Sequence, residues 1–519
     1  MNIVFFKTLI INKDFVYRII MRKSFYWGAV LPFMMCFGVG SPCGAQVIVP
    51  RTLDMRQVVE LAHKHSIASM SNRNNFAASY WSYRSYRAQL LPSLSLNANL
   101  VNFNRSLVQL QDYNSGAISY RANYNMKNDV SLNFRQNIPW TGGSVSLSTQ
   151  LSRLDQYSPA RLTTYYAQPV YLTYAQTLCG YNQFKWRKET EPKQYEIAKR
   201  QYIESMEQLS QTTVALFWNC VSTKESYERA VKSFDEGKRL FEAGRTRFEM
   251  GTITRDQLMQ IEVRILNDSL SVSNSMVNLR TTMNRLCSYI GYQEDTDLIL
   301  IIDYNIPDIT LDYNDVVERA LQNSSFSLRQ DMQYIQADES VARAKAGRSL
   351  SASVNARFGM SGSADRFNDT FIQLKDQEVI GVQFTIPILD WGQGRGNVRM
   401  AEARAQTTRY ELEQSLIDYR QELYTQVMQF NDQRSQCEIA RRVALLAEES
   451  YESAFHNFGS GSMSMTQLDQ LKEKRDQAVS LYLDKVAGFW KYYFGIRRAT
   501  LFDYESGVDI SAHFDKLVK

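Results

Sequence analysis

The spacing of apolar residues switches between helix-like and strand-like patterns along the first half of the chain. Residues 52–90 show helical spacing without Gly or Pro, with Asp54 as the expected N-cap. From residue 93 the period changes to two, and apolar residues alternate with Ser and Asn. Strand patterns of this kind occur four times, at 93–103, 129–138, 143–154 and 165–178. A polar loop is expected over 104–128 and a tight turn over 139–143.

Long helices follow these strands, and the second half repeats the order. One helix is predicted from about Pro192 to Phe248, and a second, after a glycine-containing turn, to about Ile290. The second half has helical patterns at 310–348, 397–458 and 464–500 and strand patterns at 350–359 and 378–389. The helix 397–458 would be roughly 90 Å long, so it must pack beside other long helices.

Two pairs of segments show that the chain is internally duplicated. Residues 52–66 and 310–324 are identical at eight of fifteen positions, at an offset of 258. Residues 247–267 and 457–477 align at an offset of 210, with Phe, Gly, Leu and Gln in register. This period is far too long for a solenoid unit and indicates a duplicated half-molecule. The expected parts are a first repeat at 46–300, a second repeat at 301–502 and a C-terminal tail at 503–519.

The strand patterns point to a membrane. Their apolar residues alternate with Ser, Asn, Thr and Gln, as lipid-facing and lumen-facing positions of a barrel do. One chain has too few strands to close a barrel, and a membrane does not tolerate open sheet edges. Both problems disappear if several chains pool their strands into one barrel and their helices into another.

Charge argues against nucleic acid as a partner. The 519 residues carry a formal charge of +5, but residues 1–45 hold five of the 59 basic residues and one of the 54 acidic ones. The rest of the chain is therefore almost neutral, with 54 basic and 53 acidic residues and no basic run.

The N-terminal segment has the pattern of an export signal. A basic pair at 22–23 precedes an apolar stretch at 25–39 and small residues at 41–45. We expect residues 1–45 to be a signal peptide cleaved after Ala45, with Met21 as an alternative start.

The sequence leaves two alternatives open for the N-terminal segment. Residues 24–50 carry no charge, so an uncleaved membrane anchor is the alternative, although Pro32 breaks a short apolar core. Lipid attachment at Cys36 or Cys43 is not decided by the sequence.

No constellation of residues suggests catalysis, a metal or a cofactor. The remaining cysteines are isolated, at 179, 220, 287 and 437, without metal-ligand or redox spacing. His63 and His65 point apart on a helix, and the run Gly392–Gly396 lacks the spacing of a dinucleotide fingerprint. Acid pairs such as Glu448-Glu449 are expected on solvated helix faces. We therefore expect a protein that is not an enzyme.

The junctions between elements carry a family likeness. Two Thr-Leu-Asp helix starts, the Leu90-Leu91-Pro92 entry into a strand, the exit at residues 386–392 and two glycine turns occur in one order. Over residues 50–502 this order resembles the TolC family of outer-membrane efflux proteins.

The resemblance implies a mainly α fold with a membrane β part. Three chains would form an α-helical tunnel from long-helix hairpins, topped by a shared transmembrane β-barrel in the outer membrane of a Gram-negative cell. The implied task is passive: an exit duct for small molecules, docked onto a periplasmic adaptor and an inner-membrane pump of RND or ABC type. A duct for type I protein secretion and a periplasmic coiled-coil scaffold without a pore are the alternatives.

The glycine turns are the expected docking site for the adaptor. Glycine suits chain reversal between helices because it adopts positive φ, and Thr254 and Ser464 are expected N-caps of the returning helices. Ile253 and Met463 are expected to be exposed adaptor contacts. The predicted docking tip comprises Gly251, Thr252, Ile253, Thr254, Gly461, Ser462, Met463 and Ser464.

A periplasmic gate is expected just past the second turn. Some family members narrow the tip there with a ring of Asp, and the aligned positions here are Gln467 and Gln470. Asp469 is one residue off and would face elsewhere on a helix. A ring of amides would close sterically with weak charge selectivity.

The strand number departs from the family, whose members usually supply two strands per half. The four patterns of the first half imply either two membrane strands plus an additional hairpin, which we favour, or a barrel that gains strands. Aromatic residues expected at the membrane interface are Trp140, Tyr165, Tyr166, Tyr171 and Tyr174.

Overall fold

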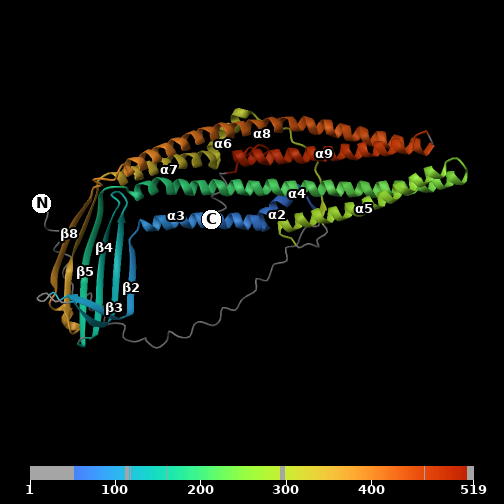
Figure 1. The fold of residues 1–519 in the computed structure, drawn as a ribbon. Helices are drawn as coiled ribbons and strands as arrows, with labels where there is room; N and C mark the ends of the chain where they lie inside the picture. Colours follow the sequence, from blue (N-terminus) through green and yellow to red (C-terminus); the bar gives the residue numbers. More distant parts are fainter. Residues whose placement is uncertain are drawn as a thin grey trace. The chain divides into compact units, whose positions relative to one another are not determined.

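The computed structural model describes residues 52–111, 116, 118–158, 160–292, 298–460 and 462–510 (Figure 1). The predicted signal peptide, with Cys36 and Cys43, lies outside the described residues, as does most of the C-terminal tail.

Each predicted helix at the start of a repeat is broken once, at a serine. Residues 52–90 form α2 (Met55–His65) and α3 (Ile67–Gln89), and residues 310–348 form α6 (Tyr313–Asn323) and α7 (Ser325–Arg348). At both breaks, Ser66 and Ser324, the backbone is extended and the hydroxyl accepts the N–H of the next helix. Serine competes with the helix for backbone hydrogen bonds, which explains why it ends one helix and caps the next. The predicted cap Asp54 is confirmed, because its side chain accepts from Gln57 N.

Two pairs of long helices make up most of the molecule. They are α4 (Gln183–Glu249), α5 (Arg255–Ile290), α8 (Gln393–Ser460) and α9 (Met465–Thr500), and Figure 1 shows each pair as a hairpin lying beside the other. The predicted start of α4 near Pro192 was wrong. The helix begins nine residues earlier because the Asn182 side chain caps it, accepting from the N–H groups of Phe184 and Lys185. Among the described residues, no helix is long and apolar enough to cross a lipid bilayer.

The internal duplication is visible in the buried positions. Val58 and Ala62 of α2 are fully buried, and so are Val316 and Ala320 of α6, each 258 residues later. After the strands the offset is 210: Thr254, which caps α5, corresponds to Ser464, which caps α9. The element order of the first repeat therefore recurs in the second.

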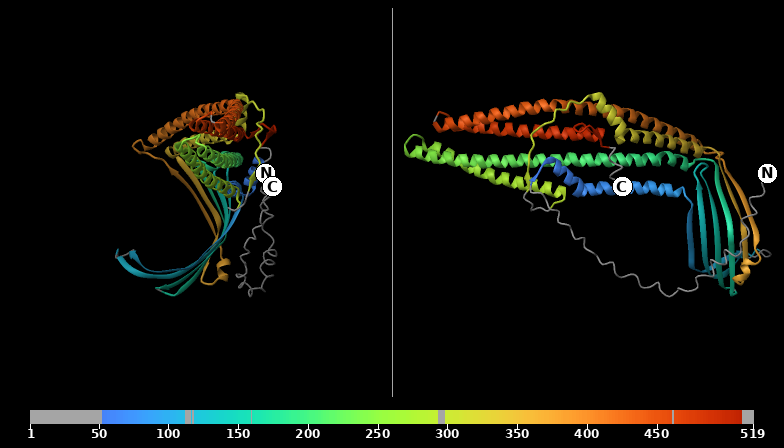
Figure 2. Two further views of the ribbon diagram at one scale, coloured as in Figure 1. Left: turned by 90° about the vertical axis from the view of Figure 1, so that its right-hand side faces the viewer. Right: turned by 180° about the vertical axis from the view of Figure 1, so that it is seen from behind.

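All the long strands belong to one antiparallel sheet. Its order is β2 (Ser93–Gln111), β3 (Ile118–Ile138), β4 (Gly143–Ser158), β5 (Leu162–Cys179), β7 (Ser351–Ala364) and β8 (Lys375–Thr385). Figure 2 shows that this sheet is strongly curved. Short pairs also form between β1 (Thr52–Leu53) and β6 (Ile299–Leu300) and between β9 (Phe502–Asp503) and β10 (Val508–Asp509), and the 3-10 turn η1 (Asn368–Phe371) precedes β8.

Two strand predictions need correction. Residues 104–128 are not simply a polar loop, because β2 and β3 stay paired as far as Gln111 and Ile118. The strand signal of β3 was present in the sequence and was overlooked, since Ile118, Tyr120, Ala122, Tyr124 and Met126 alternate with polar residues and share one face. In the second half β8 ends at Thr385 rather than 389, and Pro387 just beyond it has no N–H to donate to a ladder.

Three glycines in different surroundings allow the effects of three Gly→Ala substitutions on stability to be ranked. Gly291 ends α5 at φ 84°, and a Cβ there would lie 2.7 Å from the His65 carbonyl oxygen, whereas Gly251 has φ 74° with open space around it. Gly291→Ala should cost about 2–3 kcal/mol of unfolding free energy and Gly251→Ala about 1 kcal/mol. Gly396→Ala, in an open part of helix α8, should stabilise by about 0.5–1 kcal/mol. Equal effects of all three in denaturant titrations would contradict this ranking.

Candidate functional site

The sheet has one apolar face. A row of apolar side chains runs across five neighbouring strands through successive cross-strand pairs: Leu94, Phe134, Leu147, Leu172 and Phe358. All five are at least 40% exposed. The same face continues on β8 with Ile380, Val382 and Phe384, which are 50–65% exposed. A soluble surface rarely carries a continuous apolar patch of this extent, so this face is suited to lipid.

The opposite face is polar and more deeply buried. Ser148 donates to Asn133 at 2.9 Å, and Gln168 donates to Gln377 at 2.6 Å. Ser148 and Gln168 are only 6% and 4% exposed. Side chains on the inside of a curved sheet converge and shield one another, so these residues lie on its concave side. A concave polar face and a convex apolar face are the arrangement of a pore wall.

The five predicted interface aromatics do not share one face. Tyr174 pairs with Val145, and Tyr165 lies two residues from Ala167, which pairs with Leu151, so both are on the apolar face.

By contrast, Tyr166 pairs with Ser152 and Tyr171 with Ser148, which places them on the polar face. Including these two in one girdle was wrong, because neighbouring residues of a strand point to opposite sides.

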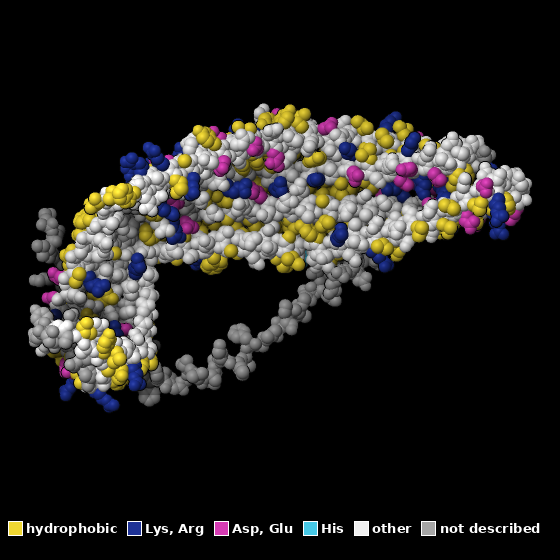
Figure 3. Space-filling model, viewed as in Figure 1, with side chains coloured by type: hydrophobic (Ala, Val, Ile, Leu, Met, Phe, Trp, Pro, Cys, Tyr) yellow, Lys and Arg dark blue, Asp and Glu magenta, His cyan; other side chains and the backbone are white. Residues whose placement is uncertain are grey.

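Tryptophans mark the end of the sheet that joins the helices. Trp140, in the turn between β3 and β4, is 86% exposed, and Trp391, between β8 and α8, is 90% exposed. Ile388 and Leu389 beside Trp391 are also exposed, and Figure 3 shows hydrophobic surface where the orange strands of Figure 1 meet α8. Tryptophan favours the boundary between lipid and water. Trp391 lies in the exit segment 386–392 but was not among the interface residues predicted from the sequence.

In the run Gly392–Gly396, next to this tryptophan, the chain passes from the sheet into helix α8. Asp390 accepts from the N–H of Gly392 at 2.9 Å and of Gly394 at 2.8 Å, which begins helix α8. The carboxylate occupies the donors that a bound phosphate would need.

At the far end of the helices, the two hairpin turns share one design. Thr252 N–H donates to the Arg247 carbonyl at 2.9 Å, and Ser462 N–H donates to the Asn457 carbonyl at 3.1 Å. The predicted caps Thr254 and Ser464 are confirmed, each within a capping box. Gly251 has the expected positive φ, and Gly461 lies outside the described residues.

Two predicted adaptor contacts are less accessible than expected. Ile253 and Met463 are half-buried, and both line a cavity of about 480 Å³ between the turns. Met463 packs on a buried cluster that includes Leu240 and Leu468. The expectation that these side chains are exposed was wrong, because the two hairpins pack against each other as far as their turns. The exposed tip residues are instead Gly251, Thr252, Thr254, Ser462 and Ser464.

The predicted gate residues lie on the first turns of α9. The Gln467 side chain accepts from Ser464 N–H at 3.1 Å, so it already serves the helix cap, while Gln470 is exposed. Asp469 faces elsewhere, as expected, and pairs with Arg264 at 3.1 Å. A gate at Gln467 and Gln470 stays a prediction.

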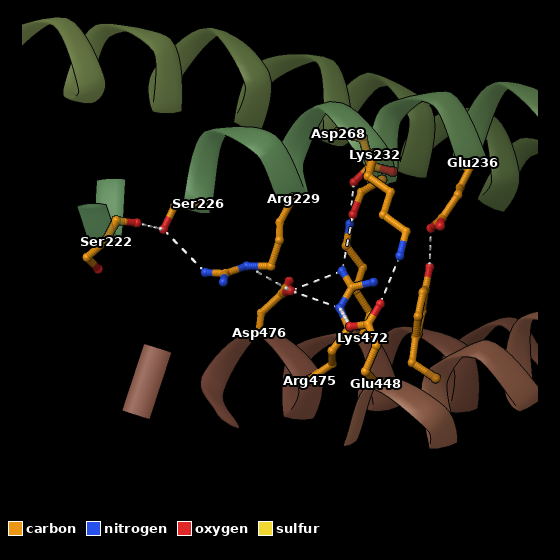
Figure 4. A network of polar contacts seen from close by, with 12 residues as sticks. Ser222, Ser226, Arg229, Lys232, Glu236, Asp268, Glu448, Lys472, Arg475 and Asp476 are labelled. Atoms are coloured by element: carbon orange, nitrogen blue, oxygen red, sulfur yellow. Dashed lines mark hydrogen bonds and ion pairs between the residues drawn. The ribbon is translucent and has the colours of Figure 1, made fainter. Parts of the chain in front are cut away.

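A buried ionic network joins the two hairpins near their tips (Figure 4). Arg475 of α9 is fully buried, lies 3.0 Å from Asp476 and 3.7 Å from Glu448, and stacks 4.1 Å from the Tyr451 ring. Lys232 of α4 reaches Glu448 at 2.8 Å. Glu448 therefore belongs to an ionic network, and the expectation that it lies on a solvated helix face was wrong.

The network continues towards the tip through α5. Arg264 and Asp268 are 6% and 5% exposed, and Lys472 of α9 reaches Asp268 at 2.5 Å. Burial raises the pKa of Asp469 although Arg264 is adjacent. The sequence carries a signal for these residues, because Arg475 follows the buried Leu468 by one heptad and thus occupies a core position.

His63 lies in a half-buried contact between α2 and α4. Its Nε2 is 2.7 Å from Ser210 Oγ, and burial, with nearby Arg497, lowers its pKa to about 4. Among the described residues, no group of three or more His, Cys, Asp or Glu side chains is placed to hold a metal ion.

Acid should weaken the fold through His63. The unfolded chain binds a proton near pH 6.5, and the folded chain only near pH 4. Stability is therefore complete above pH 6.5 and falls by roughly 3 kcal/mol as the pH drops to 4. Unfolding titrations between pH 7.5 and 4.5 should show this loss, and His63→Gln should reduce it. His456→Gln, which alters an exposed histidine, should leave the pH dependence unchanged.

Comparison with known proteins is consistent with this arrangement. Residues 316–481 match the family model described as outer membrane efflux protein. No curated protein matches the chain in sequence.

Several solved structures share the fold. The Campylobacter jejuni CmeC outer membrane channel is 14% identical with a TM-score of 0.63, over 89% of this chain and 88% of that one. The outer membrane protein VceC from Vibrio cholerae is 14% identical with a TM-score of 0.58, over 86% and 95%. The Neisseria gonorrhoeae MtrE outer membrane channel is 14% identical with a TM-score of 0.56, over 87% and 89%.

Proposed function

Because the chain belongs to the outer membrane efflux protein family, we propose that it is an outer-membrane exit duct that carries small molecules out of a Gram-negative cell. The observation that carries this proposal is the apolar row across the sheet, half-exposed on the convex face and backed by a polar concave face. A protein without a membrane-spanning pore has no use for such a sheet. Transport is passive, and the protein has no catalytic role.

A homotrimer is supported by apolar stripes that none of the described residues cover. Helix α5 exposes residues at heptad-like spacing, namely Met259, Val263, Leu266, Leu270 and Val277. Helix α8 exposes Ile439, Val443 and Leu446. Stripes with this spacing pack against other helices, and neighbouring copies supply them in a closed helical tunnel.

The tips are proposed to dock a periplasmic adaptor, which connects the duct to an inner-membrane pump of RND or ABC type. The exposed hydroxyl side chains of Thr252 and Ser462 are the accessible groups there, with the cavity lined by Ile253 and Met463 between the two turns. A photo-crosslinker at Thr252 or Ser462 should capture the adaptor in cells. The same probe at exposed Asn278, far along α5, should not.

Conductance tests the duct directly. The purified full chain, added to a planar lipid bilayer, should give discrete current steps, and a deletion strain should become sensitive to small toxic compounds. Absence of current from correctly trimeric protein would favour the periplasmic scaffold. Loss of a secreted protein, with unchanged drug sensitivity, would favour the type I secretion duct.

A further inference from the structure

The first repeat contains a β-hairpin that the second repeat lacks. The offset between matching residues falls from 258 before the strands to 210 after them, so 48 residues of the first repeat have no counterpart. Correspondingly, four strands lie between α3 and α4, but only β7 and β8 lie between α7 and α8.

The additional strands are an integral part of the sheet. β3 pairs with β4 from Tyr124 and Ser158 to Ile138 and Gly143, which is nearly the whole length of β4. The apolar face also continues without interruption onto the β2–β3 hairpin, where Leu94 and Leu96 are 66% and 68% exposed. This continuity means that all four strands of the first repeat meet the same lipid.

The two outer strands are matched to each other. Six antiparallel strands alternate in direction, so β2 and β8 run in opposite directions at the two edges of the sheet. Both have one end beside the helices, because Ser93 follows α3 closely and Thr385 precedes α8 closely. β8 has 11 residues, enough to cross a membrane as a tilted strand. A second copy of this chain therefore offers each edge an antiparallel partner at the same level.

We propose that three copies close a barrel of eighteen strands, six from each, by pairing β2 of one copy with β8 of the next. This inference rests on the proposed trimeric duct and sets its width. A barrel of this size is about 35 Å across its backbone, compared with about 24 Å for twelve strands. Its lumen is wide enough to stay an open aqueous channel, so the outer-membrane section does not select cargo by size.

Disulfide crosslinking distinguishes the two barrels. Ser95 of β2 and Gln383 of β8 are exposed and lie on the polar face, as does Ser146 of β4. In a Cys179→Ala background, Ser95→Cys combined with Gln383→Cys should give covalent dimers and trimers on non-reducing gels. Shifting one cysteine to Asn97 or Gly381 allows for stagger between the strands.

Ser146→Cys with Gln383→Cys is the matched control. It should not crosslink, and crosslinking by this pair alone would overturn the eighteen-stranded barrel while leaving the trimeric duct intact. If neither pair reacts, the number of strands in the barrel is determined by electron cryomicroscopy of the unmodified trimer. Eighteen strands would support the proposal, and twelve would refute it. Absence of any trimer would instead count against the proposed function itself.

Discussion

Arg475→Ala is expected to lower the free energy of unfolding by about 3–5 kcal/mol, which is a large effect for one helix residue. The side chain is fully buried among Asp476, Glu448 and the Tyr451 ring, so its removal leaves carboxylates without their central cation and opens a cavity. Denaturant titration of the full chain in detergent, followed by circular dichroism, measures the loss.

Three variants separate charge from volume. Arg475→Met fills the space over Tyr451, and Asp476 and Glu448 keep Arg229 and Lys232 as partners, so its loss should be smaller than that of Ala. Adding Glu448→Gln to Arg475→Met should cost less than the sum of the two single changes, since both belong to one network. Lys474→Ala, at the exposed neighbouring position, should change stability by less than about 0.5 kcal/mol. A similar loss for Lys474→Ala would mean that any substitution in this part of α9 lowers the unfolding free energy, so that the ionic network has no particular role in stability.

Leu132→Arg is expected to prevent stable assembly in the membrane. Leu132 pairs with Leu96 and Thr149 on the apolar face and is 39% exposed. An arginine facing lipid costs about 2–4 kcal/mol near the bilayer centre, and a trimer carries that cost three times. The measurement is the amount of trimer that survives in detergent extracts of the outer membrane and its dissociation temperature.

The adjacent residue is a matched control. Ser131 points to the polar face, between Asn97 and Gln150, so Ser131→Arg should leave the trimer level close to that of the unmodified protein. Equal damage from both substitutions would contradict the assignment of lipid and lumen faces. Full tolerance of Leu132→Arg would show that the apolar row does not lie in the membrane.

Sequence reasoning succeeded where a local pattern determines the structure. The caps at Asp54, Thr254 and Ser464 and the glycine turn at 251 could be predicted, because capping depends on residues within one turn of the chain. The breaks at Ser66 and Ser324 were not, since serine inside a helical pattern does not reveal whether it caps or is merely tolerated.

The candidate site was less predictable, because it depends on contacts between distant segments. Glu448 and Lys232 are 216 residues apart in the chain, and nothing near either one signals the pairing. Ile253 resembles an exposed turn residue until the second hairpin packs beside it. The far part of the β2–β3 hairpin was missed although it carries a local signal: apolar residues of β3 from Ile118 to Met126 alternate with polar ones, so this strand was predictable from the sequence.

The additional pair of strands in the first repeat also bears on how this architecture can vary. Two antiparallel strands added together leave from and return to the same end of the sheet, so the strands that follow keep their direction. Only the first repeat has this pair, so the two halves of the chain contribute unequally to the sheet. Strands added in such pairs enlarge the circumference of the sheet without altering the long helices. Pore diameter and tip geometry are therefore separately adjustable properties in this chain.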